Sequence, residues 1–309
     1  MAAIVEVNNL SKQFDDVKAV DGLSFFVNEG DVYGFLGQNG AGKSTTIRMM
    51  LTLIQPTGGE ISIFGKNIRV HRNEILQNIG AIIERPDHYK YLSAYDNLAI
   101  FAKMSGMSVS RKLIMDQLEM VGLAERYNSK AKTFSQGMKQ RLGIAIALVH
   151  NPSLLILDEP TNGLDPQGIA DIRNLILKLS REMGKTIIVS SHLLSEIELV
   201  ANRMIIIHKG KKMAEGVVHE LLDPSQTVVL LETTDNSAAL EVLRGRGWKT
   251  TSIHDRFIHL TINKKDIPVL VTDLTTAGIG MIALQPRHSL EEYFLSLTNN
   301  ETHVESLTN

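Results

Sequence analysis

The chain has 309 residues, of which 43% are hydrophobic and 21% charged, a composition typical of a soluble globular protein that is long enough for two domains. Lys and Arg total 32 against 34 Asp and Glu, giving a formal charge of −2, which does not favour a protein that coats nucleic acid. The absence of cysteine excludes disulfides and thiolate metal sites, and no run approaches the ~18 apolar residues of a membrane-spanning helix. At the start, "MAAIVEVNNLSKQF" lacks the pattern of a secretory signal. Work at a membrane would therefore need another chain as anchor.

A phosphate-binding loop is predicted at residues 37–44. The segment "GFLGQNGAGKSTT" contains the pattern G-x-x-x-x-G-K-S, directly after a strand-like stretch and before the helix-like "TTIRMML". Glycines let the backbone curl so that its N–H groups face a phosphate, and the helix N-terminus adds its dipole. In this pattern Lys43 bridges the β- and γ-phosphates and the Ser44 hydroxyl binds Mg²⁺. An ordinary glycine-rich turn is the alternative.

Residues 86–150 carry helical patterns and no strand signal, for example in "SAYDNLAIFAKMSGM" and "RKLIMDQLEMVGLAERY". We interpret this segment as a helical subdomain inserted into a sheet domain. Near its end, "TFSQGMKQRLGIAIAL" at 133–148 places Ser135 and Gly137 just before an apolar helix. A serine in that place is usually only an N-cap.

The stretch "LLILDEPTNGLD" supplies candidate carboxylates at the end of an apolar strand. Asp158 stands where a carboxylate holds Mg²⁺, directly or through water, at the carboxyl edge of a parallel sheet. Glu159 is the better catalytic candidate, because hydrolysis needs a base or an orienting group for the attacking water. The alternative is that both side chains belong to a solvated strand end.

The apolar runs predict an α/β fold. Strand-like stretches at 31–37, 153–160, 185–192 and 203–210 alternate with helical segments, and three of them are nearly continuous Ile, Leu and Val. Such runs are typical of parallel strands that are buried on both faces, with helices as crossovers.

A separate C-terminal domain is predicted at 219–309. Its segments spell βαββαβ, the order of a ferredoxin-like unit. A final amphipathic "SLEEYFLSL" would close the unit, and the polar tail "TNNETHVESLTN" is expected to fray. The domain has no motif of its own, which favours packing or dimer contacts over catalysis.

Four motifs in order, "GQNGAGKST", "FSQGMKQR", "LLILDEPTNGLD" and "SSH" at 190–192, resemble the nucleotide-binding subunits of ABC (ATP-binding cassette) transporters across about residues 1–218. The resemblance implies a P-loop NTPase fold, with a RecA-like core and a helical subdomain, that binds ATP and Mg²⁺ and hydrolyses ATP to drive transport. It also implies a homodimer or heterodimer of ATP-binding subunits, a separate transmembrane permease, and a peripheral position on the cytoplasmic face of the cell membrane. No nucleic acid partner is expected.

The resemblance also assigns roles to single residues. It implies that Ser135 and Gly137 contact the γ-phosphate of the nucleotide held by the opposite subunit, that His192 senses or positions this phosphate, and that Phe14 stacks on adenine. Asp165 is expected at the dimer seam. With the loop, the expected nucleotide-binding set is Phe14, Gly37, Gln38, Asn39, Gly40, Ala41, Gly42, Lys43, Ser44, Thr45, Ser135, Gly137 and Asp165. The expected catalytic set is Glu159, His192 and Lys43, and the expected metal set is Ser44, Glu84 and Asp158.

Two positions depart from the family pattern. The family signature reads L-S-G-G-Q, whereas residues 134–138 read Phe-Ser-Gln-Gly-Met, which leaves the role of the last position open. Where the family has a glutamine after the strand "IGAII", this chain has Glu84. The added negative charge either strengthens metal binding or weakens ATP affinity, and the sequence does not decide between these effects.

Together with these two departures, the stretches "ERPDHYKYLSAYDNL" and "NGLDPQGI" resemble those of the bacitracin and lantibiotic-resistance type of ATP-binding protein. Proteins of this type serve ABC-2-like exporters of peptide antibiotics or other amphiphiles. The alternative class is a soluble ABC-type ATPase acting on ribosomes or nucleic acid. Such proteins carry two cassettes or long coiled coils, and this chain has one cassette and no heptad array. A non-catalytic partner in a heterodimer is disfavoured because Lys43, Ser135, Asp158, Glu159 and His192 are all present.

Overall fold

The computed structural model describes residues 3–222, 227–254 and 256–288. The chain divides into two compact units, residues 1–218 and 219–309, each considered by itself below. The expected closing helix "SLEEYFLSL" and the polar tail lie outside the described residues.

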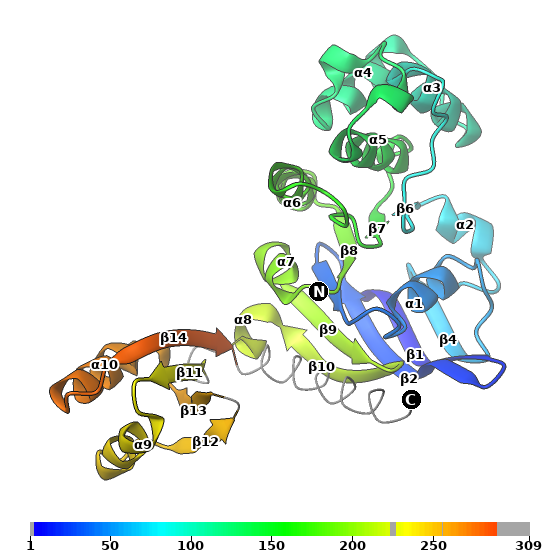
Figure 1. Ribbon diagram of the computed structural model, residues 1–309. Helices are drawn as coiled ribbons and strands as arrows, with labels where there is room; N and C mark the ends of the chain where they lie inside the picture. The colour runs from blue at the N-terminus through cyan, green and yellow to red at the C-terminus, as the bar shows by residue number, and fades with distance from the viewer. Residues whose placement is uncertain (1–2, 223–226, 255, 289–309) are drawn as a thin grey trace, which may run out of the picture. The chain divides into compact units, whose positions relative to one another are not determined.

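A six-stranded sheet forms the centre of the first unit (Figure 1). Its five neighbouring strands β9, β3, β8, β7 and β6 are parallel, and β10 is antiparallel at the edge beside β9. Strands β3, β7 and β8 are buried along their whole length, and for β7 and β8 the continuous apolar runs predicted this. The α/β fold class is therefore confirmed. In sheet order the strands are β10 (Lys211–Val217), β9 (Arg203–His208), β3 (Val32–Leu36), β8 (Thr186–Ser191), β7 (Leu154–Leu157) and β6 (Ile79–Ile82).

A second, antiparallel sheet was not predicted from the sequence. It joins β2 (Val17–Asn28), β1 (Ala3–Phe14), β4 (Gly58–Ile63) and β5 (Lys66–Asn67) in that order. Its long strands alternate buried and exposed side chains, so they lack the apolar runs of buried parallel strands. One hydrophobic core joins this sheet to helix α1 (Lys43–Met50) and to the six-stranded sheet.

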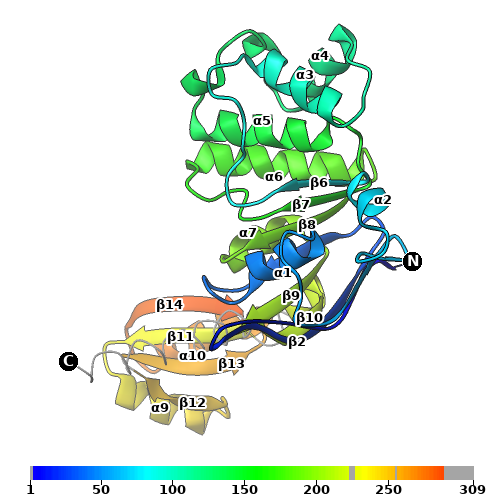
Figure 2. The ribbon, with the colours of Figure 1, turned by 90° about the vertical axis from the view of Figure 1, so that its right-hand side faces the viewer.

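The segment predicted to be helical consists of helices joined by loops (Figure 2). Here α3 (Ala94–Met104), α4 (Arg111–Met120) and α5 (Gln136–Leu148) pack together, with short 3₁₀ turns at Ala124–Arg126 and Ala131–Thr133. Ser93, Ser110 and Ser135 cap the three helices by accepting a hydrogen bond from a backbone N–H. The remaining helices of this unit are α2 (Arg72–Leu76), α6 (Pro166–Arg181) and α7 (Leu194–Val200), and α6 runs alongside α5.

The second unit has its own four-stranded antiparallel sheet, with strand order β12-β13-β11-β14. Along the chain the elements follow the βαββαβ order, and buried leucines such as Leu231, Leu243 and Leu274 join the sheet to its two long helices. The elements are β11 (Thr227–Thr233), α9 (Asn236–Gly245), β12 (Thr250–His254), β13 (Phe257–Ile262), a 3₁₀ turn (Lys264–Asp266), α10 (Ile267–Thr276) and β14 (Met281–His288), preceded by α8 (Val218–Leu221).

Within the described part of the chain, no helix has both the length and the apolar character needed to span a bilayer.

Candidate functional site

The glycine-rich loop lies between the carboxyl end of β3 and the first turn of α1. Gly42 caps α1 with a φ of 104°, a left-handed conformation that favours glycine. A Cβ atom at Gly42 would lie 2.5 Å from the carbonyl oxygen of Ala19, and one at Gly37 would lie 2.6 Å from that of Ile207. Both glycines are therefore required by close backbone packing.

Lys43 is buried at the base of this loop, with only 5% of its surface exposed. Its Nζ atom donates to the carbonyl oxygens of Gly37 at 2.6 Å and Gln38 at 3.2 Å, and lies 2.9 Å from Oε1 of Glu159. The lysine charge therefore faces the carboxyl end of the neighbouring strands, where several polar side chains lie together.

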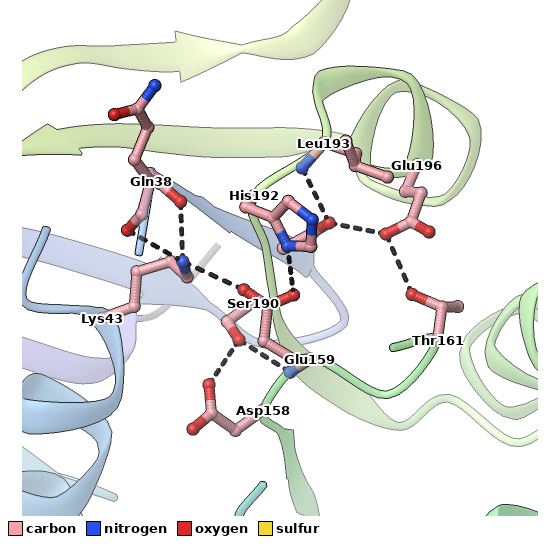
Figure 3. A network of polar contacts seen from close by, with 11 residues as sticks. Gln38, Lys43, Asp158, Glu159, Thr161, Ser190, His192, Leu193 and Glu196 are labelled. Atoms are coloured by element: carbon pink, nitrogen blue, oxygen red, sulfur yellow. Dashed lines mark hydrogen bonds and ion pairs between the residues drawn. The ribbon is translucent and has the colours of Figure 1, made fainter. Parts of the chain in front are cut away.

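Residues from the ends of β7 and β8 complete this cluster (Figure 3). Ser190 donates from Oγ to Oδ1 of Asp158 at 2.5 Å and accepts from the backbone N–H of Glu159 at 2.8 Å. On the other side of Glu159, Oε2 lies 2.8 Å from Nδ1 of His192. Lys43, Asp158, Glu159 and His192, predicted from separate motifs, are thus brought into one network.

Asp158 has the property expected of a cation ligand. It is fully buried, one carboxylate oxygen is bound by Ser190, and the other, Oδ2, has no hydrogen-bond partner among the residues that the structure describes. A buried carboxylate oxygen without a partner is costly. Since Mg²⁺ is commonly held by one or two protein oxygens and substrate phosphates, the residues fit such an ion.

Glu84 follows β6, the neighbour of β7 in the sheet. It has a φ of 58°, its side chain is 63% exposed, and it forms an ion pair with Arg48 of α1. In the same loop, burial lowers the pKa of His88. Glu84 therefore lies on the same edge of the sheet as Asp158, with Arg48 as its partner.

Ser135, Gly137 and Asp165 lie at the starts of two helices. Ser135 is exposed and caps α5 through a 3.2 Å hydrogen bond from the N–H of Met138. Asp165 caps α6 in the same way, through Gly168. A Cβ atom at Gly137 would meet only Gly168, at an ordinary 3.8 Å. Packing within the chain therefore does not explain the glycine at 137.

Phe14 ends β1, with 44% of its surface exposed and the Lys12 ammonium 4.8 Å from its ring centroid. It is therefore an accessible aromatic side chain, available for stacking.

Sequence reasoning missed the residues that hold the cluster together. Ser190 binds both carboxylate-bearing residues that follow β7, and Glu196 of α7 accepts hydrogen bonds from Thr161 and Ser191. The two polar residues that end the apolar strand, in "SSH", were the only signal for this arrangement.

Comparisons with known proteins identify the family. The family model for "ABC transporter" matches residues 20–162. The ABC transporter ATP-binding protein YhcH of Bacillus subtilis (strain 168) is 41% identical over 96% of this chain and 97% of its own length. The bacitracin transport ATP-binding protein BcrA of Bacillus licheniformis is 46% identical over 84% of this chain and 83% of its own.

Similar solved structures belong to the same family as these relatives. The cbiO1 protein of Clostridium perfringens, part of an ABC transporter complex, has a TM-score of 0.65 at 28% identity and covers 71% of this chain and 90% of its own. The dimeric ATP-binding cassette MJ0796, bound to ADP and phosphate, has a TM-score of 0.62 at 27% identity and covers 69% of this chain and 98% of its own. The chain belongs to the ATP-binding proteins of ABC transporters, a family of ATPases.

Proposed function

We propose that this chain drives the export of a peptide antibiotic or a similar amphiphile, by closing with a second ATP-binding subunit over two ATP molecules at the cytoplasmic face of the cell membrane. A separate permease would carry the substrate. The name of the BcrA relative, bacitracin transport, supports this substrate class. The observation that carries the proposal is the convergence of Lys43, Asp158, Glu159 and His192 in one network.

In this proposal the loop at 37–45 binds the phosphates of ATP. Its backbone N–H groups and the N-terminus of α1 face the phosphates, and Lys43 supplies a positive charge to the β- and γ-phosphates. Lys43 exchanges Glu159 and the two carbonyl oxygens for phosphate oxygens as ATP binds. Phe14, accessible at the end of β1, stacks on adenine.

Mg²⁺ would be held by the Ser44 hydroxyl and Asp158, with Glu84 as a further candidate. When bound, it neutralises the charge that develops on the phosphate oxygens. Ser190 keeps Oδ1 of Asp158 occupied, which leaves Oδ2 for the cation.

Glu159 orients and deprotonates the attacking water in this mechanism. With the carboxylate ionised, the proton between the two side chains belongs to Nδ1 of His192. Nε2 of the same ring then carries a lone pair, so it can donate to a γ-phosphate oxygen only when the imidazole is protonated on both nitrogens. The 2.8 Å contact between Nδ1 and Oε2 thus sets both the position and the tautomer of His192.

Ser135 and Gly137 act on the nucleotide of the opposite subunit. The support is that both lie at the exposed start of α5 and that packing within the chain does not explain Gly137. An exposed helix start offers backbone N–H groups and a dipole to a phosphate. Asp165, which starts α6 beside α5, would lie at the same seam between subunits.

The test is ATP hydrolysis by the Glu159→Gln variant, purified together with its permease. We expect hydrolysis to fall by at least ~100-fold, because the general base is lost, while ATP binding is retained. Glu125→Gln changes an exposed glutamate of the helical subdomain and serves as the control. Hydrolysis at the wild-type rate by Glu159→Gln would remove Glu159 from the mechanism.

The substrate class needs its own test. Expression of this chain with its permease in a bacitracin-sensitive bacterium should raise the tolerated bacitracin concentration, and Glu159→Gln should abolish the increase. No protection against bacitracin or other membrane-active peptides would refute the substrate class while leaving the ATPase assignment intact.

A further inference from the structure

We propose that Glu196 is a positioning residue for ATP hydrolysis, acting by holding the loop of Glu159 against the loop of His192. The inference rests on the proposed roles of Glu159 and His192. Glu196 lies in the first turn of α7, immediately after the loop that follows β8, and is half-buried (Figure 3).

One carboxylate oxygen of Glu196 joins two loops. Its Oε2 accepts a hydrogen bond from Oγ of Ser191 at 2.5 Å and from Oγ1 of Thr161 at 2.9 Å. Ser191 directly precedes His192, and Thr161 is the second residue after Glu159. Hydrogen bonds to an ionised acceptor are about twice as strong as neutral ones, so both loops are held at a single point.

Ser190 and Ser191 attach the Glu159 loop to β8 from opposite faces of the strand. Successive side chains of a strand point to opposite faces. Ser190 binds Asp158 and the N–H of Glu159 on one face of β8, whereas Ser191, which also accepts from the N–H of Leu193 at 3.0 Å, binds Glu196 on the other. The Glu159 loop is therefore attached to β8 on both sides.

Glu159 needs such support because its backbone is in an uncommon conformation. Its φ of 49° lies in the left-handed region, which a non-glycine residue adopts only where its surroundings enforce it. Two hydrogen bonds hold this strained position in place, one from the N–H of Glu159 itself to Ser190 and one from Thr161, two residues later, to Glu196. Loss of the Glu196 attachment would let Glu159 shift relative to His192, and a displacement near 1 Å can cost ~100-fold in rate.

The experiment measures kcat, KM and ATP binding of the full chain with its permease for Glu196→Ala, Glu196→Gln and His192→Ala. We expect Glu196→Ala to lower kcat by roughly 10- to 100-fold with the dissociation constant of ATP unchanged. Glu196→Gln should recover kcat to within about threefold, because the amide oxygen still accepts both hydroxyl hydrogen bonds. Glu182→Ala, an exposed glutamate at the end of α6, is the control.

The double variant Glu196→Ala/His192→Ala separates positioning from general damage. If Glu196 acts through the Glu159–His192 contact, the double variant hydrolyses ATP no more slowly than His192→Ala alone. If the loss of kcat in the double variant equals the product of the losses in the two single variants, the proposal is overturned. A wild-type kcat in Glu196→Ala would also overturn it. Failure of the proposed function has a different signature, namely wild-type hydrolysis by Glu159→Gln or His192→Ala.

A second variant covers the case in which Glu196→Ala does not fold. Thr161→Val keeps the side-chain shape and removes one of the two donors to Glu196. It should lower kcat in the same direction by a smaller factor, with ATP binding retained. A wild-type kcat in Thr161→Val would then reject the attachment at Thr161.

Discussion

Lys43 contacts both its own loop and a carboxylate that follows the end of β7. Its ammonium group binds backbone carbonyl oxygens of its own loop and also pairs with Glu159. A buried charge of this kind is stable only while its partners are in place. The residue therefore connects the glycine-rich loop to Glu159, the proposed catalytic carboxylate.

Replacing this lysine should mainly affect nucleotide affinity. Lys43→Met keeps the aliphatic stem and removes the charge, and hydrogen bonds to charged groups are worth about 1.5–3 kcal/mol. ATP binding is therefore expected to weaken roughly 10- to 100-fold, measured by calorimetric titration. Lys112→Met, at an exposed position of α4, is the control, and unchanged affinity in Lys43→Met would contradict the loop assignment.

His150 gives the stability a pH dependence of known sign. Burial lowers its pKa, and Nε2 lies 3.1 Å from the carbonyl oxygen of Ile79. Because the folded pKa lies below the unfolded value near 6.5, the unfolded chain binds the proton first as the pH falls. The contribution is therefore complete above pH ~6.5 and is lost as the pH falls through the lowered pKa.

His150→Gln isolates this contribution, because its amide can still donate to Ile79 without titrating. The free energy of unfolding, from denaturant titrations at pH 7.5 and 5, is expected to fall less for the variant than for the wild type. Equal losses would show that His150 does not contribute to the acid sensitivity.

At the scale of elements, two glycines allow α5 to pack closely against its neighbours. A Cβ atom at Gly143 would lie 2.4 Å from Cβ of Pro86, in the loop that follows Glu84, and one at Gly80 of β6 would lie 2.2 Å from the carbonyl oxygen of Ala147. The helix is thus packed directly against both the strand and the loop.

Gly143→Ala tests this packing. Overpacking a tight contact typically costs about 1–3 kcal/mol, which exceeds the gain of up to ~1 kcal/mol from helix propensity. A lower free energy of unfolding is therefore expected by denaturant titration. Gly137→Ala, on the same helix, meets no close atom and should leave stability unchanged or slightly higher, and equal effects of the two changes would contradict the packing account.

The elements that were predictable are those whose signal is local. Continuous apolar runs indicated β7, β8 and β9, a shorter strand-like stretch indicated β3, and the glycine-lysine pattern indicated the turn into α1, because each depends on neighbouring residues alone. The alternating strands β1 and β2 carried a weaker pattern and were missed. Pairs such as Glu196 with Thr161, or Arg48 with Glu84, depend on how distant loops meet, which no local pattern records.

At the scale of the whole molecule, each unit has a hydrophobic core of its own. The predicted catalytic and nucleotide-binding residues all fall in the first unit. The second unit has the βαββαβ order expected from the sequence. Its role in packing or dimer contacts stays a prediction.

The proposed site is shared between subunits, so ATP should control assembly. A ligand shifts an equilibrium only by its different affinity for the two states, and here a closed dimer adds contacts from Ser135 and Gly137. Glu159→Gln is expected to sediment as a dimer with ATP and Mg²⁺, and as a monomer without them.

Ser135→Arg in the Glu159→Gln background should prevent this dimer while each chain still binds ATP. A dimer that forms equally well with Arg at 135 would show that the start of α5 does not face the second nucleotide.

The contacts of α5 have a mechanical consequence. The helix has 13 residues, so it is a rod of about 20 Å, with Ser135 at its start and the Glu84 loop in contact along its side at Gly143. Close-packed groups transmit strain rather than absorb it. A displacement of the loop at Pro86 that preserves this contact must carry the rod with it, so this loop sets the orientation of the helix start at Ser135.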